Sequence, residues 1–133
     1  MIILKKAKKK DLPLLIECKL LTITPYLNNN EEKLSAIAYV NNFVRNHFDK
    51  FIIIYYYFKK VGCYLMMDNE LDTLYIDNNY QNRGIGSKIL KKENINKIKV
   101  KKKNEKAIKF YEKNGFKKYL EKENNEFEKS DNE

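Results

Sequence analysis

The sequence changes character near residue 50, and this change limits the folds that are open to it. Residues 2–7 alternate loosely and predict a short strand, and residues 12–48 have helical periodicity that breaks around Thr24-Pro25. From Phe51 onward, β-branched and aromatic segments alternate with helical ones. A chain with this order of elements buries a sheet between helices, so we expect an α/β fold with a mixed sheet.

Helix and strand signals place the individual elements. Asp11 is expected to cap the first helix, and residues 31–48 predict a second helix. Its apolar stripe is expected to face the core: Leu34, Ile37, Ala38, Val40, Phe43, Val44 and Phe48. Residues 51–58 and 61–67 predict a hairpin that turns at Lys59-Lys60. The later expected elements are a strand over 71–76, a helix after Gly86, a strand over 95–100, a helix capped by Asn104, and a strand over 116–120.

The length of 133 residues fits one domain. We expect this domain to cover residues 1–121, and residues 122–133 to be a polar tail that either adds a short last strand or frays. The 18 residues after Gly115 are expected to be too few for a full hairpin of two strands that would close the sheet at this end of the chain. If that hairpin is missing, one side of the domain is open or is completed by a second subunit in a homodimer.

The net charge of +9 raises the question of a nucleic-acid partner. The 27 basic residues include only two arginines, Arg45 and Arg83. Lys, Asn and Ile share A/T-rich codons, so codon bias explains much of the charge, and surfaces that read nucleic acid usually rely on arginine. A nucleic-acid-binding module built on the lysines of 97–103 is therefore the weaker alternative. A basic field does concentrate polyanionic ligands.

Cysteine and histidine usage excludes several chemistries. Cys18 and Cys63 form no CxxC pair, so we expect reduced core cysteines in a cytoplasmic protein. The single histidine, His47, argues against a zinc site and against a His-assisted nucleophile, so we expect no metal. The longest apolar run, Phe51 to Phe58, is too short to cross a bilayer, and no signal peptide is expected.

Two of the four glycines, Gly84 and Gly86, lie between a predicted strand and a predicted helix. Glycine allows successive backbone N–H groups to turn outward around an anion, and the helix N-terminus adds a favourable dipole. Each N–H bond to a charged oxygen contributes about 1.5–3 kcal/mol, whereas the dipole contributes about 0.3–2 kcal/mol. The surrounding residues exclude a Walker loop and a dinucleotide fingerprint. A purely structural strand-to-helix turn would explain the two glycines about as well.

Two blocks of sequence resemble the GNAT superfamily of N-acetyltransferases. The first runs from Leu74 to Gly86 and contains Gln81-Asn82-Arg83-Gly84-Ile85-Gly86, which is similar to the superfamily signature Gln/Arg-x-x-Gly-x-Gly/Ala after a strand. The second, residues 104–116, resembles a later helix of the same family. The resemblance implies the GNAT fold, a twisted mixed β-sheet flanked by about four helices, and acetyl-coenzyme A as the donor.

The resemblance also implies roles for individual residues. The backbone of Leu74, Tyr75 and Ile76 would pair with the pantetheine arm, and one N–H there would polarise the thioester carbonyl. Asn104 matches an asparagine that contacts the donor, and Tyr111 matches the tyrosine that protonates the departing thiolate. Residues 81–87, called the phosphate turn below, would hold the pyrophosphate through main-chain N–H groups: Gln81, Asn82, Arg83, Gly84, Ile85, Gly86 and Ser87. A core tyrosine and a plain helix cap are the alternative interpretations of Tyr111 and Asn104.

The acceptor side is less well defined. Family members often carry a glutamate base in a Leu-Glu-Val strand, but the matching residues are Ile98-Lys99-Val100, so that base is absent. Glu70 and Asp72 are candidate substitutes, and a pair of edge charges is their alternative interpretation. The expected reaction is direct attack of a primary amine, on a small molecule or a protein, on acetyl-coenzyme A in a ternary complex. A coenzyme A-binding protein without efficient catalysis is the main alternative.

Overall fold

The structure is a computed structural model that describes residues 1–121 and 124–129, with side chains described as far as Lys118. Its elements follow the predicted order closely. The strands are β1 (Ile2–Lys6), β2 (Phe51–Tyr56), β3 (Lys59–Met67), β4 (Glu70–Ile76), β5 (Lys97–Lys101), β6 (Phe116–Glu121) and β7 (Asn124–Lys129). The α-helices are α1 (Leu12–Ile23), α2 (Asn30–His47), α3 (Ile85–Lys92) and α4 (Glu105–Lys113), and a short 3₁₀ helix, η4, covers Asn78–Tyr80.

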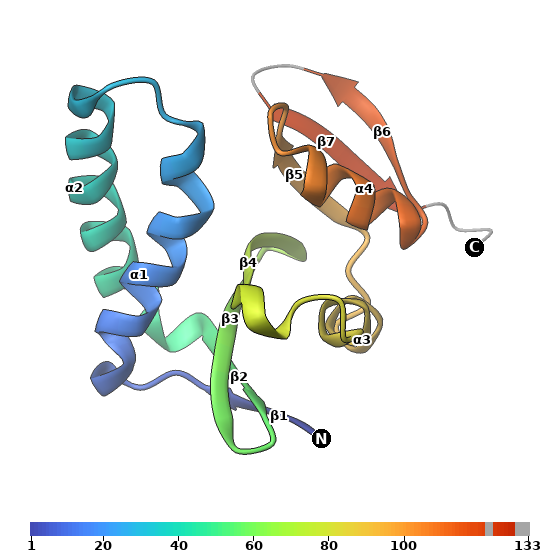
Figure 1. Ribbon diagram of the computed structural model, residues 1–133, viewed down its shortest axis with the longest axis horizontal. Helices are drawn as coiled ribbons and strands as arrows, with labels where there is room; N and C mark the ends of the chain where they lie inside the picture. The colour runs from blue at the N-terminus through green and yellow to red at the C-terminus, as the bar shows by residue number, and fades with distance from the viewer. Residues whose placement is uncertain (122–123, 130–133) are drawn as a thin grey trace.

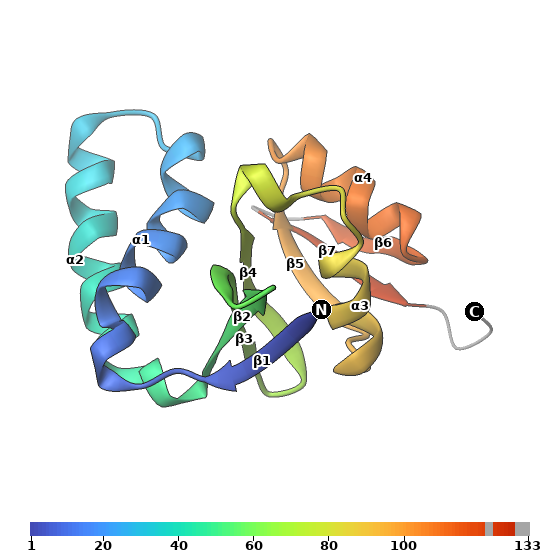
Figure 2. The same cartoon turned by 60° about the horizontal axis from the view of Figure 1, so that its bottom comes forward.

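The described strands form one sheet in the order β1-β2-β3-β4-β5-β7-β6, which confirms the predicted mixed α/β architecture. Only β4 and β5 are parallel neighbours. Figures 1 and 2 show α1 and α2 side by side on one side of the central strands, with α3 and α4 on the other. Each helix pair buries its own apolar cluster against the sheet, so the sheet separates two cores.

Strand β7 lies within residues 122–133, for which the sequence leaves open either a short last strand or a frayed polar tail. It pairs with β5 on one edge and with β6 on the other, both antiparallel. The expectation that the residues after Gly115 are too few for a closing hairpin was therefore wrong. Strand pairing is a backbone interaction, and a strand that is hydrogen-bonded on both edges does not need an apolar sequence to be recruited into a sheet.

The β2–β3 hairpin turns at Tyr57-Phe58, and not at Lys59-Lys60 as predicted. Both turn residues have left-handed backbone, with φ of 48° and 70°. The two lysines instead begin β3 and pair with the end of β2. Polar residues are common in turns, but their presence does not by itself fix where a turn lies. The position of this turn follows from the register of β2 and β3, because each strand must direct its apolar residues to the correct core.

The apolar stripe predicted for α2 is only partly buried. Val40 and Val44 are buried, but Leu34 is 68% exposed and Ile37 is 42% exposed. Figure 1 shows the reason, because the connected ends of α1 and α2 extend past the strands that the two helices cover. Helical periodicity therefore predicted the helix correctly and its buried length incorrectly.

The helix caps are also only partly as predicted. The Asp11 side chain makes no cap hydrogen bond to α1. It accepts instead from the Lys8 N–H at 2.8 Å and from the Lys60 ammonium at 3.0 Å, which ties the β1–α1 connection to β3. Asn104 does cap α4, because its side-chain oxygen accepts from the Ala107 N–H at 3.1 Å.

Candidate functional site

Strands β4 and β5 diverge soon after they start. Their pairing consists of Glu70 opposite Lys97 and Leu71 opposite Ile98. Both strands continue past these two pairs, but in the described part of the chain they make no further pairs with each other. The later half of β4 therefore has an edge with no strand paired to it among the described residues, and we call the space beside this edge the opening.

A β-bulge marks the point where the two strands separate. Leu65 pairs with Thr73 and Met66 pairs with Leu71, which leaves Asp72 as an extra residue in β4. A bulge leaves its extra residue out of the ladder and bends the strand that carries it. The bulge thus lies directly after the last β4–β5 pair, where the bend turns β4 away from β5.

Backbone direction along β4 determines which groups face the opening. The Asp77 N–H donates to the Val61 carbonyl at 2.8 Å, so residue 77 directs its backbone groups toward β3. Backbone groups alternate along a strand, so Tyr75 also points toward β3, and Leu74 and Ile76 point toward the opening. Of the three residues expected to pair with a pantetheine arm, only these two present their N–H groups there.

The phosphate turn lies at the end of the opening and leads into α3. Gly84 has left-handed backbone, with φ of 79°, and so does Asn82, with φ of 63°. In the described part of the chain, the N–H groups of residues 82–87 donate no hydrogen bond, and the first helical bond of α3 runs from the Lys88 N–H to the Gly84 carbonyl at 3.1 Å. Unpaired amides at the start of a helix are a ready anion-binding site.

The Gln81 side chain holds the phosphate turn in place. Its amide nitrogen donates to the Ile76 carbonyl at 2.8 Å and to the Asn78 side chain at 3.0 Å. Its amide oxygen accepts from the Lys106 ammonium on α4. Gln81 therefore links the end of β4, the turn and α4. Lys106 was missed at the sequence level, because it lies 25 residues away and only the fold brings it to the turn.

Arg83 is held by aromatic rings. Its guanidinium carbon lies 5.8 Å from the centre of the Tyr56 ring and 5.4 Å from that of Tyr80, and one of its nitrogens donates to the Asn79 carbonyl at 3.3 Å. Cation–π contacts of this kind orient the guanidinium plane while leaving N–H groups at its rim. The Arg83 side chain is thus fixed beside the backbone of the phosphate turn and still has N–H groups that can donate to a ligand.

The two glycines of the turn serve different physical needs. At Gly84 an added Cβ would meet nothing within 4 Å, so this position needs glycine only for its left-handed backbone. At Gly86 an added Cβ would lie 2.7 Å from Cζ of Phe110 on α4. Gly86 therefore allows α3 and α4 to approach closely, which sets the distance between the phosphate turn and the residues of α4.

Tyr111 on α4 is buried in the core between the sheet and α3. It is 8% exposed, and its ring packs edge-on against Phe110 and Phe116. Burial raises the pKa of its phenol well above the ordinary value. Within the described residues its hydroxyl makes no hydrogen bond to another protein group. A buried hydroxyl normally has a partner, either in the protein or in ordered water.

An ion pair between a buried lysine and a partly exposed aspartate lies on the other face of the sheet beside the bulge. The Lys19 ammonium on α1 donates to Asp72 at 2.9 Å and to the Thr73 hydroxyl at 2.9 Å, and that hydroxyl donates to Asp72 at 2.7 Å. All of these contacts on Asp72 involve one carboxylate oxygen, Oδ2, and its side chain is 34% exposed. Glu70 makes no hydrogen bond or ion pair within the described residues, and it lies where β4 and β5 are still paired.

Lys19 was not singled out from the sequence, although a signal exists. It follows Leu15 by four residues and therefore falls on the buried face of α1, where a lysine is rarely found without a partner. Its ammonium also lies 4.7 Å from the centre of the Phe43 ring on α2. A charged residue at a core position of a helix is thus a sign of a buried ion pair.

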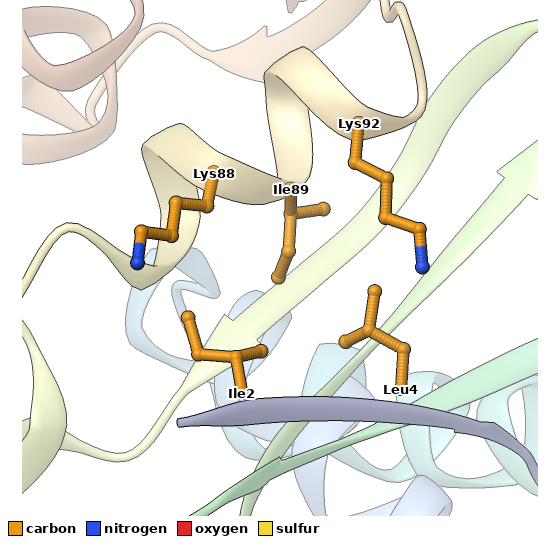
Figure 3. A pocket seen from close by; sticks show the side chains of 5 residues that line it. All are labelled: Ile2, Leu4, Lys88, Ile89 and Lys92. Atoms are coloured by element: carbon orange, nitrogen blue, oxygen red, sulfur yellow. The ribbon is translucent and has the colours of Figure 1, made fainter.

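A separate cavity of about 210 Å³ lies between β1 and α3. Figure 3 shows Ile2 and Leu4 of β1 facing Ile89 of α3, with Lys88 and Lys92 extending on either side. The described residues contain no cluster of three or more potential metal ligands. Among the described helices, none combines the length and apolar character that a membrane-spanning helix requires.

The diverging strands and the phosphate turn agree with what the comparisons find. Residues 47–118 match the family model described as an acetyltransferase (GNAT) domain, which is 72 of the 133 residues. The chain therefore belongs to the GNAT acetyltransferase family. No curated protein matches the sequence.

Solved structures support the same fold along nearly the whole chain. PaiA N-acetyltransferase from Thermoplasma acidophilum, in complex with coenzyme A, is 25% identical, with a TM-score of 0.72 over 98% of this chain and 99% of that one. Apo YjaB from Escherichia coli is 18% identical, with a TM-score of 0.71 over 96% and 95%. Arabidopsis thaliana Naa50 in complex with the bisubstrate analogue CoA-Ac-MVNAL is 24% identical, with a TM-score of 0.58 over 97% and 98%.

Proposed function

We propose that this GNAT protein transfers an acetyl group from acetyl-coenzyme A to a primary amine by direct attack in a ternary complex. One observation carries the proposal: the free edge of β4 leads directly into a turn whose N–H groups at 82–87 have no partner in the described part of the chain. An extended polar arm that ends in a diphosphate is complementary to this arrangement. The coenzyme A present in the PaiA structure supports the same donor class.

The reacting carbonyl would lie beside the β4 edge. Leu74 and Ile76 direct their N–H groups into the opening, and an N–H placed there stabilises the oxyanion that forms when an amine attacks the thioester. Removing one such donor typically costs about 10²–10³ in rate. These main-chain donors need no side chain, so the apolar side chains of Leu74 and Ile76 are compatible with catalysis.

Tyr111 would donate a hydrogen bond to the departing sulfur. Its raised pKa keeps the phenol protonated throughout the physiological range. Thiols have pKa values of about 8.5, well below that of a phenol, so Tyr111 stabilises the thiolate chiefly as a hydrogen-bond donor. The proton that finally neutralises the sulfur can then come from the acceptor amine, which must lose one in the reaction.

Asp72 is better placed than Glu70 to meet the acceptor amine. It lies at the bulge where the strands separate, and its Oδ1 accepts no hydrogen bond within the described residues. Lys19 and Thr73 hold the other oxygen and so fix the direction of the free one. We assign Asp72 the role of orienting the amine, and Asn104 a donor contact through the amide nitrogen that its cap leaves free.

Removing one N–H group from the phosphate turn tests the donor site. Ser87 lies in the first turn of α3, where proline is tolerated, so Ser87→Pro deletes an amide donor while Ser87→Ala keeps it. We expect Ser87→Pro to weaken coenzyme A binding about tenfold or more in calorimetry, and Ser87→Ala to bind within about twofold of the wild type. Thiol release from acetyl-coenzyme A across a panel of amines then tests catalysis.

The outcomes separate the alternatives. No binding heat with coenzyme A would end the enzyme proposal. Binding without thiol release for any amine would favour the coenzyme A-binding protein without catalysis. Equal loss of affinity in Ser87→Pro and Ser87→Ala would show that the side chain, and not the amide, contacts the donor.

A further inference from the structure

The turn between β2 and β3 has a composition that folding alone does not favour. Tyr57 and Phe58 both have left-handed backbone, in which a side chain crowds the following carbonyl, and two-residue hairpin turns favour Asn-Gly for that reason. Their side chains are 63% and 78% exposed, so burial does not compensate for the strain. Strained, exposed aromatic residues are typical of ligand-binding sites.

A line of aromatic rings connects this turn to the phosphate turn. The Tyr57 ring meets the Tyr56 ring edge-on at 4.8 Å, and the Tyr56 ring meets the Tyr80 ring at 5.9 Å. Arg83 lies over both Tyr56 and Tyr80 and directly precedes Gly84. The Lys59 ammonium lies 5.5 Å from the centre of the Tyr80 ring. We call Tyr56, Tyr57 and Tyr80 with these two cations the aromatic cluster.

The chemistry of the donor indicates what the aromatic cluster binds. In coenzyme A the diphosphate joins the pantetheine arm to a 3′-phosphorylated adenosine. If the diphosphate lies on the phosphate turn and the arm follows β4, the nucleotide must leave the turn on one of its two flanks. An adenine ring needs an aromatic platform, and a phosphate monoester needs fixed cations. The aromatic cluster offers both at one flank.

The other flank is less suitable. There Lys106 is already bonded to Gln81, and the ring of Phe110 lies against Gly86. On the aromatic side, Arg83 uses one nitrogen on the Asn79 carbonyl and keeps its remaining N–H groups for an anion. The rings at the hairpin turn are open to solvent.

We propose that the β2–β3 turn and the aromatic cluster bind the nucleotide end of the donor, with adenine stacked on the exposed rings of Tyr57 and Phe58 and the 3′-phosphate paired with Arg83 and Lys59. This inference rests on the proposed function, because it assumes that coenzyme A binds to the phosphate turn. The strained β2–β3 turn would then have a functional role, because it would help to determine which donor the protein binds.

A double substitution at the turn separates binding from folding. Tyr57→Asn with Phe58→Gly installs the residues that the turn geometry favours, so we expect the melting temperature to rise by about 2–4 °C. We expect the affinity for coenzyme A to fall about tenfold, because the stacking platform is lost. A protein that becomes more stable and binds more weakly cannot have lost affinity through misfolding.

A second variant isolates the phosphate contact. Arg83→Gln should reduce the preference for coenzyme A over 3′-dephospho-coenzyme A by about tenfold. The matched control is Arg45→Gln, which makes the same chemical change at the other arginine, exposed on α2, and should leave both affinities unchanged. Thiol release from acetylpantetheine, which lacks the nucleotide, should be the same in the wild type, in the Tyr57→Asn, Phe58→Gly variant and in Arg45→Gln.

Calorimetry with coenzyme A and with 3′-dephospho-coenzyme A shows whether the nucleotide binds at the β2–β3 turn. If the turn variant binds coenzyme A as tightly as the wild type, the inference is wrong although the enzyme proposal stands. If instead Lys88→Ala and Lys92→Ala weaken coenzyme A binding and the turn variant does not, the nucleotide occupies the cavity between β1 and α3. Absence of binding to the wild type refutes the proposed function itself.

Discussion

Gly86→Ala is expected to destabilise the protein only because of one ring on the neighbouring helix. The added Cβ would lie 2.7 Å from Cζ and 3.3 Å from Cε1 of Phe110. Leucine has neither of these atoms, so Phe110→Leu removes the clash. The same substitution at residue 86 should therefore have opposite effects on stability in the two backgrounds.

The magnitudes follow from two opposing terms. Alanine is preferred over glycine within a helix by about 1 kcal/mol. Forcing a ring aside in a packed interior costs about 1–3 kcal/mol. With Phe110 present, Gly86→Ala should lower the free energy of unfolding by about 0–2 kcal/mol, whereas in the Phe110→Leu background it should raise it by up to about 1 kcal/mol. The coupling energy between the two sites is then about 1–3 kcal/mol.

Urea unfolding followed by circular dichroism measures the four free energies of this cycle, and suits a chain without tryptophan. Gly84→Ala is the matched control, because its cost of about 1–2 kcal/mol comes from left-handed backbone alone and should be the same in both backgrounds. If the effect of Gly86→Ala is the same within about 0.5 kcal/mol in both backgrounds, the close approach of α3 and α4 does not explain this glycine.

Two further predictions concern buried side chains. Tyr111→Phe should reduce kcat by about 10²-fold or more, while its affinity for coenzyme A, measured by calorimetry, stays within about twofold of the wild type. The raised pKa of Tyr111 keeps its phenol protonated, so any loss of wild-type activity below about pH 10 should come from another group. Burial by itself would raise the pKa of Asp11, but its hydrogen bonds to a backbone N–H and to Lys60 lower the pKa below its usual value. Its contribution to stability is therefore present above about pH 4 and is lost as the pH falls through the lowered pKa. In urea unfolding at pH 7, the free energy of unfolding of Asp11→Asn should be roughly 1–2 kcal/mol below that of the wild type. This difference in free energy should narrow below about pH 4.

Much of the fold could be predicted because local signals and tertiary demands agree along most of the chain. Strand β2 consists of β-branched and aromatic residues, β3 is mainly apolar after its first two lysines, and β4 ends in Leu-Tyr-Ile. The four helices have both periodicity and recognisable ends. The prediction failed where the deciding partner is distant in sequence. The β2–β3 turn carries two aromatic residues with no turn signal, and β7 is recruited by strands on both of its edges. The exposed half of α2 has the same periodicity as its buried half.

The candidate site could be located from the sequence but not assembled from it. The paired glycines and the cap at Asn104 are local features, and both occur where the sequence indicated. Lys19 and Lys106 meet their partners only through contacts between helices and the sheet, so no local pattern shows the pairing. The bulge at Asp72 is equally hidden, because it depends on how β3 and β4 align and not on either strand alone.

This bulge connects the two halves of the proposed site. In a regular strand neighbouring side chains point to opposite faces, yet Asp72 and Thr73 both reach Lys19 on the α1 side of the sheet. The extra residue allows this, and the bend that it introduces follows directly on the last pair with β5. One inserted residue would therefore both open the edge that holds the donor and, under the proposal, turn a carboxylate oxygen of Asp72 toward the acceptor. Because both consequences come from the same backbone irregularity, the thioester and the amine would meet at a position that the sheet itself fixes, with no need for a mobile loop to bring them together.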